Sequence, residues 1–325
     1  MRQHPGTIDL KEITLPVLAV LFLFASSLYF PVLGIAVGVF TPLPVIFTYL
    51  KWGWANALAV LVIVSAILFS LSGGLFTSVF FIEYGMMAMV MAGMIHRCFL
   101  REKVVFLSSA LPAFCGIAAL IVFFSGHEAG FMGYMKEKID LALLETIKGY
   151  KEAGVGQEHV QALEIYSAQL AELFAKLIPA WLISGSFITA SLNYSAIKRV
   201  WLKWSGAEGP YFKDPSFGEW VLPDHFVWVF IASGFFLLLP FDVLNSIGVN
   251  SLFLSLLVYI IHGMAIIFFW LERKKKGRFL LYMGVFLLMI QPLLLIMIAG
   301  LGIFDIWFDF RKLRGAPPPG INEIV

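Results

Sequence analysis

The sequence carries few charged side chains. Of its 325 residues only 14% are charged, whereas 60% are hydrophobic and 16% are aromatic. Because a soluble domain has about a quarter charged residues, a water-soluble globular fold is excluded, and the apolar content also excludes disordered and fibrous classes. The formal net charge is only +2, and the basic residues stand at the ends of apolar runs, so no nucleic-acid partner is indicated.

Several motifs that would carry chemistry are missing from the sequence. The two cysteines, Cys98 and Cys115, cannot build a disulfide framework. No Gly-Lys dipeptide occurs, so the chain has no P-loop and no ATPase of its own. Gly-x-Ser-x-Gly, His-Glu-x-x-His and Cys-x-x-Cys are absent too, and the pairs His127-Glu128 and Glu158-His159 are better explained as solvated helix caps. An enzyme is therefore unsupported although not excluded, and no metal or cofactor is expected.

Long uninterrupted apolar runs dominate what is present. Runs of about 20 residues are long enough to cross a hydrocarbon layer of roughly 30 Å as helices. The sequence therefore predicts an all-α polytopic transmembrane bundle of eight or nine spans. The nine candidate spans are 13–33, 35–50, 54–71, 75–95, 104–124, 177–197, 226–247, 251–271 and 279–304.

The basic residues predict the orientation of these spans, since short cytoplasmic loops retain Lys and Arg. With a cytoplasmic N-terminus, 15 of the 23 basic residues fall in the inside segments. Those segments are 1–12, 51–53, 96–103, 198–225 and 272–278. The tail Arg311-Lys-Leu-Arg314 would then lie outside, which the same rule disfavours. Either the ninth run bends back at Pro292, or an earlier run crosses incompletely.

The predicted organisation has four parts: an N-terminal bundle (1–124), an insert (125–176), a C-terminal bundle (177–310) and a polar tail (311–325). The insert holds eight acidic and five basic residues on a helical rhythm, which predicts an extracytoplasmic amphipathic helical hairpin. It would act as a lid, a docking surface or a spacer. The Trp- and Pro-rich loop 198–225 is typical of the cytoplasmic membrane interface.

The second apolar run is short and is interrupted by Gly34, Gly38, Pro42 and Pro44. Irregular backbone at membrane depth persists only where protein or a water-filled cavity satisfies its amide groups, so such a segment points to a ligand site. The alternative is a kinked packing helix in which the two glycines form a contact surface.

Ionisable and other polar side chains inside the spans are stronger indications of a functional site. An ionisable side chain near the bilayer centre costs roughly 3 kcal/mol to insert and so usually has a partner and a function. Glu83, His262 and Gln291 stand near span midpoints, and Asp242 and Asn245 lie toward one end of the seventh run. If they converge, they form a ligand-binding pocket; otherwise each hydrogen-bonds a neighbouring helix.

A further polar set lies near the C-terminus. Asp305 and Asp309 share a helix face ahead of Arg311. They could chelate a cation, but an interfacial charged helix end explains them more simply.

Two stretches carry a family resemblance. Glu219-Trp-Val-Leu-Pro223 and Gly302-Ile-Phe-Asp-Ile-Trp-Phe-Asp-Phe-Arg-Lys312 resemble the corresponding segments of the YybS-like family of uncharacterised bacterial membrane proteins. The overall order of apolar runs is similar too, including Thr41-Pro-Leu-Pro44 followed by a Gly-containing turn at Gly53, so the likeness covers most of the chain. That family is distantly similar to the substrate-binding subunits of energy-coupling-factor transporters. The resemblance implies a multi-pass protein of the bacterial cytoplasmic membrane, working with separate ATPase and coupling subunits.

These observations leave two hypotheses for function. The first is a small-molecule binding or transport subunit without its own ATPase, with membrane lipids, an unknown small molecule and separate energising subunits as partners. The second is a non-transporting scaffold or assembly factor that binds proteins through the hairpin and the aromatic loop.

Overall fold

The structure is a computed structural model, and it is all-helical throughout the residues it describes, which are 10–30, 33–126, 130–154, 157–206, 211–212, 216–273 and 291–313. The chain divides into two compact units, unit 1 (Met1–Asp214) and unit 2 (Pro215–Val325). The predicted sixth span therefore groups with the N-terminal bundle rather than with the C-terminal one.

Five helical stretches in the described ranges are long and apolar enough to cross a membrane. They are Glu12–Tyr29, Trp54–His96, Arg101–Phe124, Gln169–Ser205 and Asp242–Arg273. Three shorter apolar helical stretches, Ala36–Trp52, Asp224–Leu237 and Leu293–Phe308, accompany them. Apolar composition thus yields helices, as the sequence predicts, although not all of them have spanning length.

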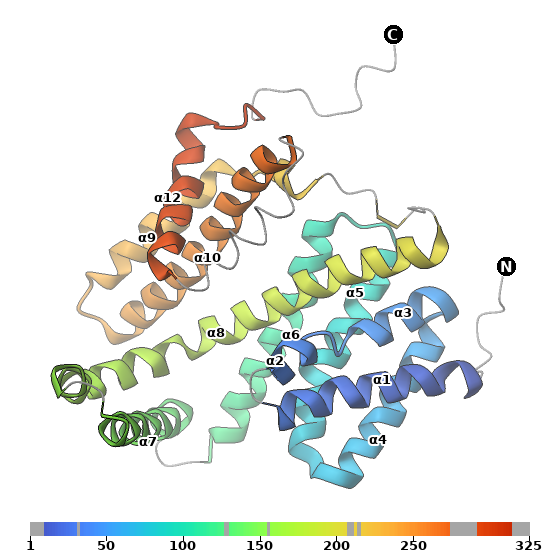
Figure 1. Ribbon diagram of the computed structural model, residues 1–325, viewed down its shortest axis with the longest axis horizontal. Coiled ribbons are helices and arrows are strands. Elements are labelled where there is room, and N and C mark those ends of the chain that lie inside the picture. The colour runs from blue at the N-terminus through green and yellow to red at the C-terminus, as the bar shows by residue number, and fades with distance from the viewer. Residues whose placement is uncertain are drawn as a thin grey trace. The chain divides into compact units, whose positions relative to one another are not determined.

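The first helices of unit 1 form a layered core (Figure 1). Helix α1 (Leu10–Tyr29) packs on α2 (Leu33–Gly38), on α3 (Leu43–Trp52) and on α4 (Trp54–Val79). Their buried side chains join those of α5 (Met86–His96) in one apolar cluster. Large members of this cluster with almost no exposed surface include Ile13, Ile46, Leu61, Met87 and Met91.

The 43-residue stretch Trp54–His96 is not one straight helix. Gly73 has φ 78° and ψ −174°, which breaks the helix, and glycine tolerates this conformation because it has no Cβ. Leu61 and Gly85, each twelve residues from Gly73, lie in contact. Contact between positions placed symmetrically about a break means that the chain reverses there. The stretch therefore contains two helical segments that correspond to the predicted runs 54–71 and 75–95.

Helix α8 (Gln157–Ser205) has 49 residues, which at 1.5 Å per residue is about 74 Å. It packs against α6 (Arg101–Phe124) and, near its start, against α7 (Gly130–Glu152). Because the hydrocarbon core is only roughly 30 Å thick, a helix this long exceeds the distance it has to span. Its most apolar part begins at Gln169.

One end of unit 1 collects basic and aromatic side chains. Lys51 Nζ lies 4.1 Å from the centre of the Trp52 ring and 5.1 Å from that of Trp204, and Arg101 Cζ lies 6.0 Å from the Tyr194 ring. These contacts bring together the end of α3, the start of α6 and the last turns of α8. Aromatic rings with cations are typical of a membrane–water interface.

Unit 2 corrects one predicted boundary. The seventh and eighth runs were expected to separate near residue 250, but α9 (Val227–Leu237) ends earlier and α10 runs without a break over Asp242–Arg273. The break at 238–241 contains Pro240, which cannot donate a backbone hydrogen bond to continue a helix. Gly248 lies inside α10, where a Cβ would press against α9 at Ser233 and Phe236.

Helix α12 (Pro292–Phe308) packs on α10 through two glycines. A Cβ at Gly263 would overlap the carbonyl of Ile298, and one at Gly302 would overlap that of Tyr259, so the backbones touch directly. The first half of the predicted ninth span, 279–290, lies outside the described residues, so the predicted bend at Pro292 stays open.

The end of α10 meets the C-terminal turn in unit 2. Ser216 Oγ donates to Glu272 Oε2 at 2.8 Å, and the carbonyl of Gly218, two residues later, accepts from Arg311. The loop 216–220, the end of α10 and the turn after α12 therefore lie at one end of this unit.

Candidate functional site

Glu83 lies in a π turn, Phe80–Gly85, between α4 and α5. The backbone N–H of Met86 bonds the carbonyl of Phe81, five residues earlier, which is the wider spacing of a π-helix. Such turns accommodate one extra residue and are frequent at functional sites. The turn directs the half-buried Glu83 toward α8, where Ser186 Oγ donates to Glu83 Oε1 at 2.7 Å.

The surroundings of this carboxylate are apolar or weakly polar. Ser186 is only 1% exposed. Phe80 and Tyr84, on the same turn, pack edge-on against Phe24 of α1, with ring centres 5.4 and 6.0 Å apart. Among the described residues Ser186 is the hydrogen-bond partner of Glu83, and no Lys or Arg forms an ion pair with it. A carboxylate at this depth thus lacks a protein counter-ion in the described part of the chain.

The interrupted segment has a protein partner for its irregular backbone. Between α2 and α3 the carbonyl of Val39 accepts a 2.8 Å hydrogen bond from Asn193 Nδ2 of α8, and Thr41 Oγ1 donates to the carbonyl of Gly38. Asn193 is fully buried. The carbonyls of Gly38 and Val39 are therefore satisfied by protein side chains, which is one of the two conditions under which irregular backbone persists at membrane depth.

The glycines and prolines of this segment have separate positions. A Cβ at Gly34 would overlap the carbonyl of Ser26, and one at Gly38 would overlap the Ser27 side chain, so both glycines lie against α1. Pro42 caps the N-terminus of α3, and Pro44 lies in its first turn, where proline is well tolerated. These contacts are those of close helix packing.

In unit 2, His262 belongs to a buried polar network centred on Arg311. Arg311 Nη1 donates to the carbonyls of Gly218 at 2.6 Å and Trp220 at 2.8 Å. Its Nη2 lies 2.8 Å from His262 Nε2 and 3.2 Å from Asp305 Oδ2. The side chains of all three ionisable residues are at most 1% exposed. We call His262, Asp305 and Arg311 the buried triad.

His262 Nε2 lies between the two charged members of the buried triad, 2.8 Å from Arg311 Nη2 and 3.3 Å from Asp305 Oδ2. A guanidinium only donates, whereas a carboxylate only accepts. Asp305 Oδ2 balances the charge of Arg311 at 3.2 Å, while its Oδ1 accepts from the backbone N–H of Phe310 at 2.9 Å. The triad thus joins α10, α12, the turn after α12 and the loop 216–220.

The prediction that Asp305, Asp309 and Arg311 form an interfacial charged helix end is wrong for Asp305 and Arg311, because both are buried. Asp309, half-buried, has φ 39° and caps the following turn through Leu313 N at 3.1 Å. One signal was available. Arg311, in the second of the two stretches that carry the family resemblance, bonds the carbonyl of Trp220 in the first, and Asp305 lies in the same stretch as Arg311.

The other predicted site residues lie apart from the triad. Gln291 is exposed at the N-cap of α12, 14 residues or about 21 Å along the helix from Asp305. Asp242 is exposed in the first turn of α10. Asn245 Nδ2 donates at 3.3 Å to the carbonyl of Leu237, so it caps the end of α9. Glu83 belongs to unit 1, and the other three predicted polar residues, like the triad, belong to unit 2.

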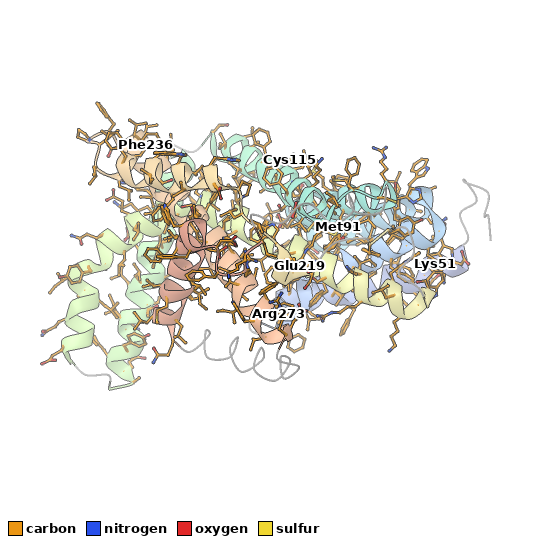
Figure 2. The ribbon with its side chains drawn as sticks, turned by 90° about the horizontal axis from the view of Figure 1, so that it is seen from above. Lys51, Met91, Cys115, Glu219, Phe236 and Arg273 are labelled. Carbon is orange, nitrogen blue, oxygen red and sulfur yellow. The ribbon has the colours of Figure 1, made fainter. Side chains whose placement is uncertain are left out.

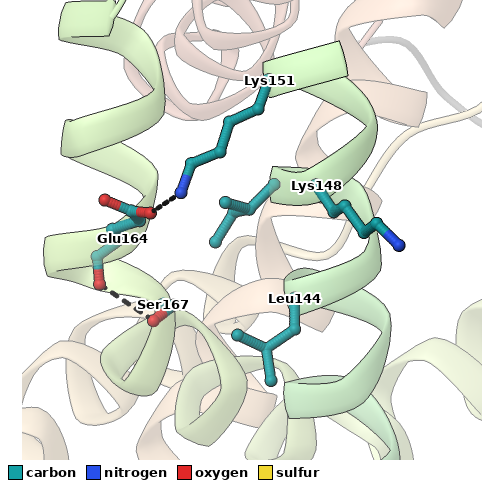
Figure 3. Close-up of a pocket in the computed structure, with 6 residues that line it drawn as sticks. Leu144, Lys148, Lys151, Glu164 and Ser167 are labelled. Atoms are coloured by element: carbon teal, nitrogen blue, oxygen red, sulfur yellow. Dashed lines mark hydrogen bonds and ion pairs between the residues drawn. The ribbon is translucent and has the colours of Figure 1, made fainter.

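One hollow lies between α7 and α8 rather than beside these polar groups. It has a volume of about 420 Å³ and is lined by Leu144, Ile147, Lys148, Lys151, Glu164 and Ser167. Figure 3 shows Lys151 of α7 reaching Glu164 of α8, with Nζ and Oε1 2.6 Å apart. Within the described ranges no three His, Cys, Asp or Glu side chains are grouped to hold a metal ion.

Apolar helices of spanning length, glycine-mediated helix contacts and ionisable side chains buried among them define a helical membrane protein. The chain belongs to the family described as predicted membrane protein (DUF2232), whose model matches residues 17–306. No curated protein and no solved structure shows a significant match to it.

Proposed function

We propose that this protein is a small-molecule binding or transport subunit of the membrane, and that its ligand contacts Glu83 in unit 1. The observation that carries the proposal is a half-buried carboxylate on a π turn whose described hydrogen-bond partner is one serine, Ser186. An ionisable residue inside a membrane helix is costly and commonly serves a ligand or a proton. A ligand with an ammonium group or several hydrogen-bond donors would compensate that cost.

We do not assign ligand binding to the buried triad. Asp305 and Arg311 contact His262 on Nε2, so we assign His262 to holding unit 2 together. We also assign Gly34, Gly38, Pro42 and Pro44 to packing, and Asn245 to helix capping, because each has a described contact of that kind. Asp242 and Gln291 are exposed helix-start residues.

The energy source would be supplied by other chains. The sequence contains no Gly-Lys dipeptide and hence no P-loop, which fits a subunit that works with separate ATPase and coupling proteins. The likeness to YybS-like proteins, and through them to energy-coupling-factor substrate subunits, supports the same proposal. We further propose the bacterial cytoplasmic membrane as its location, with the N-terminus inside.

The test is native mass spectrometry of the gently solubilised protein. Wild type is expected to retain a small molecule that Glu83→Ala loses and that Ser186→Ala weakens. Glu102→Ala, the same substitution at an exposed glutamate in the first turn of α6, is the matched control and should retain the molecule. Equal retention in Glu83→Ala and Glu102→Ala would remove the proposal, provided that both variants unfold at wild-type temperature.

A second candidate, a scaffold, is favoured by one observation. The helix pair α7 and α8 exposes apolar side chains although its composition is charged, with Leu144 59%, Ile165 70% and Tyr166 54% exposed. We propose in this case that α7 and the start of α8 lie outside the membrane as a hairpin and bind a protein partner. Replacing Leu144 and Ile165 by Lys should then abolish copurification of that partner, and unchanged copurification would contradict the scaffold.

A further inference from the structure

One end of unit 1 carries a large excess of positive charge. Three segments meet there: 51–54 at the junction of α3 and α4, 96–103 between α5 and α6, and 198–206 at the end of α8. We call them the basic face. Their only acidic residue is Glu102, and counting Glu12 in the first turn of α1 as well still leaves five positive charges in excess. The seven basic residues are Lys51, Arg97, Arg101, Lys103, Lys198, Arg199 and Lys203.

Side-chain contacts bring these segments together. Lys51 lies beside the end of α8 (Figure 2), with its Nζ 5.1 Å from the centre of the Trp204 ring. The rings of Tyr49 in α3 and His96 in α5 have their centres 6.1 Å apart. Arg101 Cζ, at the start of α6, lies 6.0 Å from a tyrosine ring of α8. The ends of α3, α5 and α8 and the start of α6 therefore share one surface.

Much of this charge is not neutralised within the described part of the chain. The ion pairs recorded there lie in α7 and α8 before residue 177 or in unit 2. The Lys51 ammonium instead lies 5.9, 4.1 and 5.1 Å from the ring centres of Phe47, Trp52 and Trp204. Aromatic faces attract a cation but carry no net charge. The positive charge of Lys51 is therefore still available to an external anion.

The basic face is at the depth of lipid headgroups. Its cations lie within about two turns of an end of the spanning stretches Trp54–His96, Arg101–Phe124 and Gln169–Ser205, or at the end of α3. Trp54, Leu100 and Trp204 are 57%, 54% and 51% exposed among them. The opposite ends of the first two stretches, at 70–78 and 121–126, contain no Lys, Arg, Asp or Glu. Aromatic rings interleaved with cations at one helix end are typical of the headgroup region.

Excess cations at this depth match one partner, the headgroups of anionic lipids. We propose that the basic face binds anionic phospholipids in preference to zwitterionic ones through their headgroup phosphates. An acidic protein would match the charge too, but the position of the cations at the ends of spanning helices favours lipid. The proposal needs no ligand at Glu83, so it and the proposed function can each fail without the other.

Headgroup preference is tested by native mass spectrometry of the detergent-solubilised full chain with an equimolar mixture of phosphatidylglycerol and phosphatidylcholine. One basic residue near an anionic lipid surface contributes the equivalent of about a fivefold gain. Wild type should therefore retain phosphatidylglycerol preferentially, and Lys51→Gln/Arg199→Gln/Lys203→Gln should lower that preference by at least about fivefold. An unchanged preference overturns the proposal, and so does loss of a copurifying acidic protein with the lipid preference unchanged.

A charge-retaining variant separates charge from packing. Lys51→Arg/Arg199→Lys/Lys203→Arg should keep the wild-type preference, and a loss equal to that of the glutamine variant would overturn the proposal.

A second control removes the same number of charges elsewhere. Lys136→Gln/Lys138→Gln/Lys148→Gln, at three exposed positions of α7, should keep the preference. An equal loss here would mean that total charge, and not the basic face, selects the lipid.

If the glutamine variant fails to fold, wild type is photolabelled with a phosphatidylglycerol that carries a diazirine in its headgroup. Adducts concentrated in 51–54, 96–103 and 198–206 support the proposal. Adducts spread equally to 70–78 and 121–126 overturn it.

Discussion

At the scale of single residues, the buried triad and Glu83 illustrate two ways of keeping charge inside apolar helices. Arg311 has an anion, an imidazole and two backbone carbonyls within hydrogen-bond distance, which compensates much of the cost of removing it from water. Glu83 has one described hydroxyl partner. The triad is therefore built for rigidity, and the lone carboxylate is the better candidate for exchange with a ligand.

Replacing Arg311 should be strongly destabilising. Arg311→Met removes the arginine counter-ion of the buried Asp305, and breaking a buried pair costs about 3–5 kcal/mol. The measurement is unfolding of the purified protein by SDS in mixed micelles, followed by circular dichroism.

Lys312→Met, at the exposed next residue, is the control and should change stability by less than about 0.5 kcal/mol. Equal losses in the two variants would mean that the triad contributes nothing specific.

At the scale of elements, glycine and proline decide where helices begin, reverse and touch. Gly73 reverses the chain within a continuous apolar stretch, Pro240 separates α9 from α10, and Gly263 and Gly302 let α10 and α12 meet backbone to backbone. The free energy of these contacts is van der Waals packing, since lipid provides little hydrophobic drive between helices.

The contact of α2 with α1 can be tested by adding one methyl group. Gly34→Ala should destabilise unit 1 by about 1–3 kcal/mol, because the Cβ would overlap the carbonyl of Ser26. Gly185→Ala, in α8 where a Cβ meets nothing within 4 Å, should instead be neutral or stabilising by up to about 1 kcal/mol. Thermal unfolding in detergent compares them, and similar midpoints would contradict this packing.

The sequence predicts apolar helices well and side-chain partners poorly, for a physical reason. Hydropathy is a property of each segment alone, so the all-helical class and most apolar runs follow from composition. Partners are set by packing: Ser186 lies 103 residues from Glu83, and Arg311 lies 49 residues from His262 and 93 from Gly218. The spacing of these residues along the chain therefore does not predict that they are in contact. The convergence of Gln291 with His262 failed to appear for the same reason.

At the scale of the whole molecule, sidedness is the property that the basic residues control. Unit 1 gathers Lys51 and Arg101 at one end, and unit 2 places Arg273 and Arg311 at one end of its own. In unit 2 this puts the start of the basic tail on the same side as the end of α10. Under the proposed orientation, in which the end of α10 faces the cytoplasm, Arg311 and Lys312 are expected on the cytoplasmic side too.

The accessibility of the two native cysteines to a thiol reagent can show which side of the membrane each end of unit 1 faces. Cys98 is exposed between α5 and α6 at the basic end of unit 1, whereas Cys115 is half-buried within α6. With Cys115→Ala as background, a membrane-impermeant maleimide should label Cys98 in inverted vesicles and not in intact cells.

The converse variant has Cys98→Ser and Gly126→Cys, which moves the thiol just beyond the other end of α6. It should be labelled in intact cells. Labelling of Cys98 from outside would reverse the proposed orientation.

The π turn at Phe80–Gly85 also bears on ancestry. A turn of this kind can arise when a single codon is inserted into a gene segment that encodes an α-helix. A homologue without that codon would keep a regular helix here; because the wider turn absorbs the extra residue, the flanking side chains would keep their directions and only those of the turn would change. Glu83 would then no longer face Ser186, so gain or loss of one codon would be enough to create or abolish the pairing within this lineage.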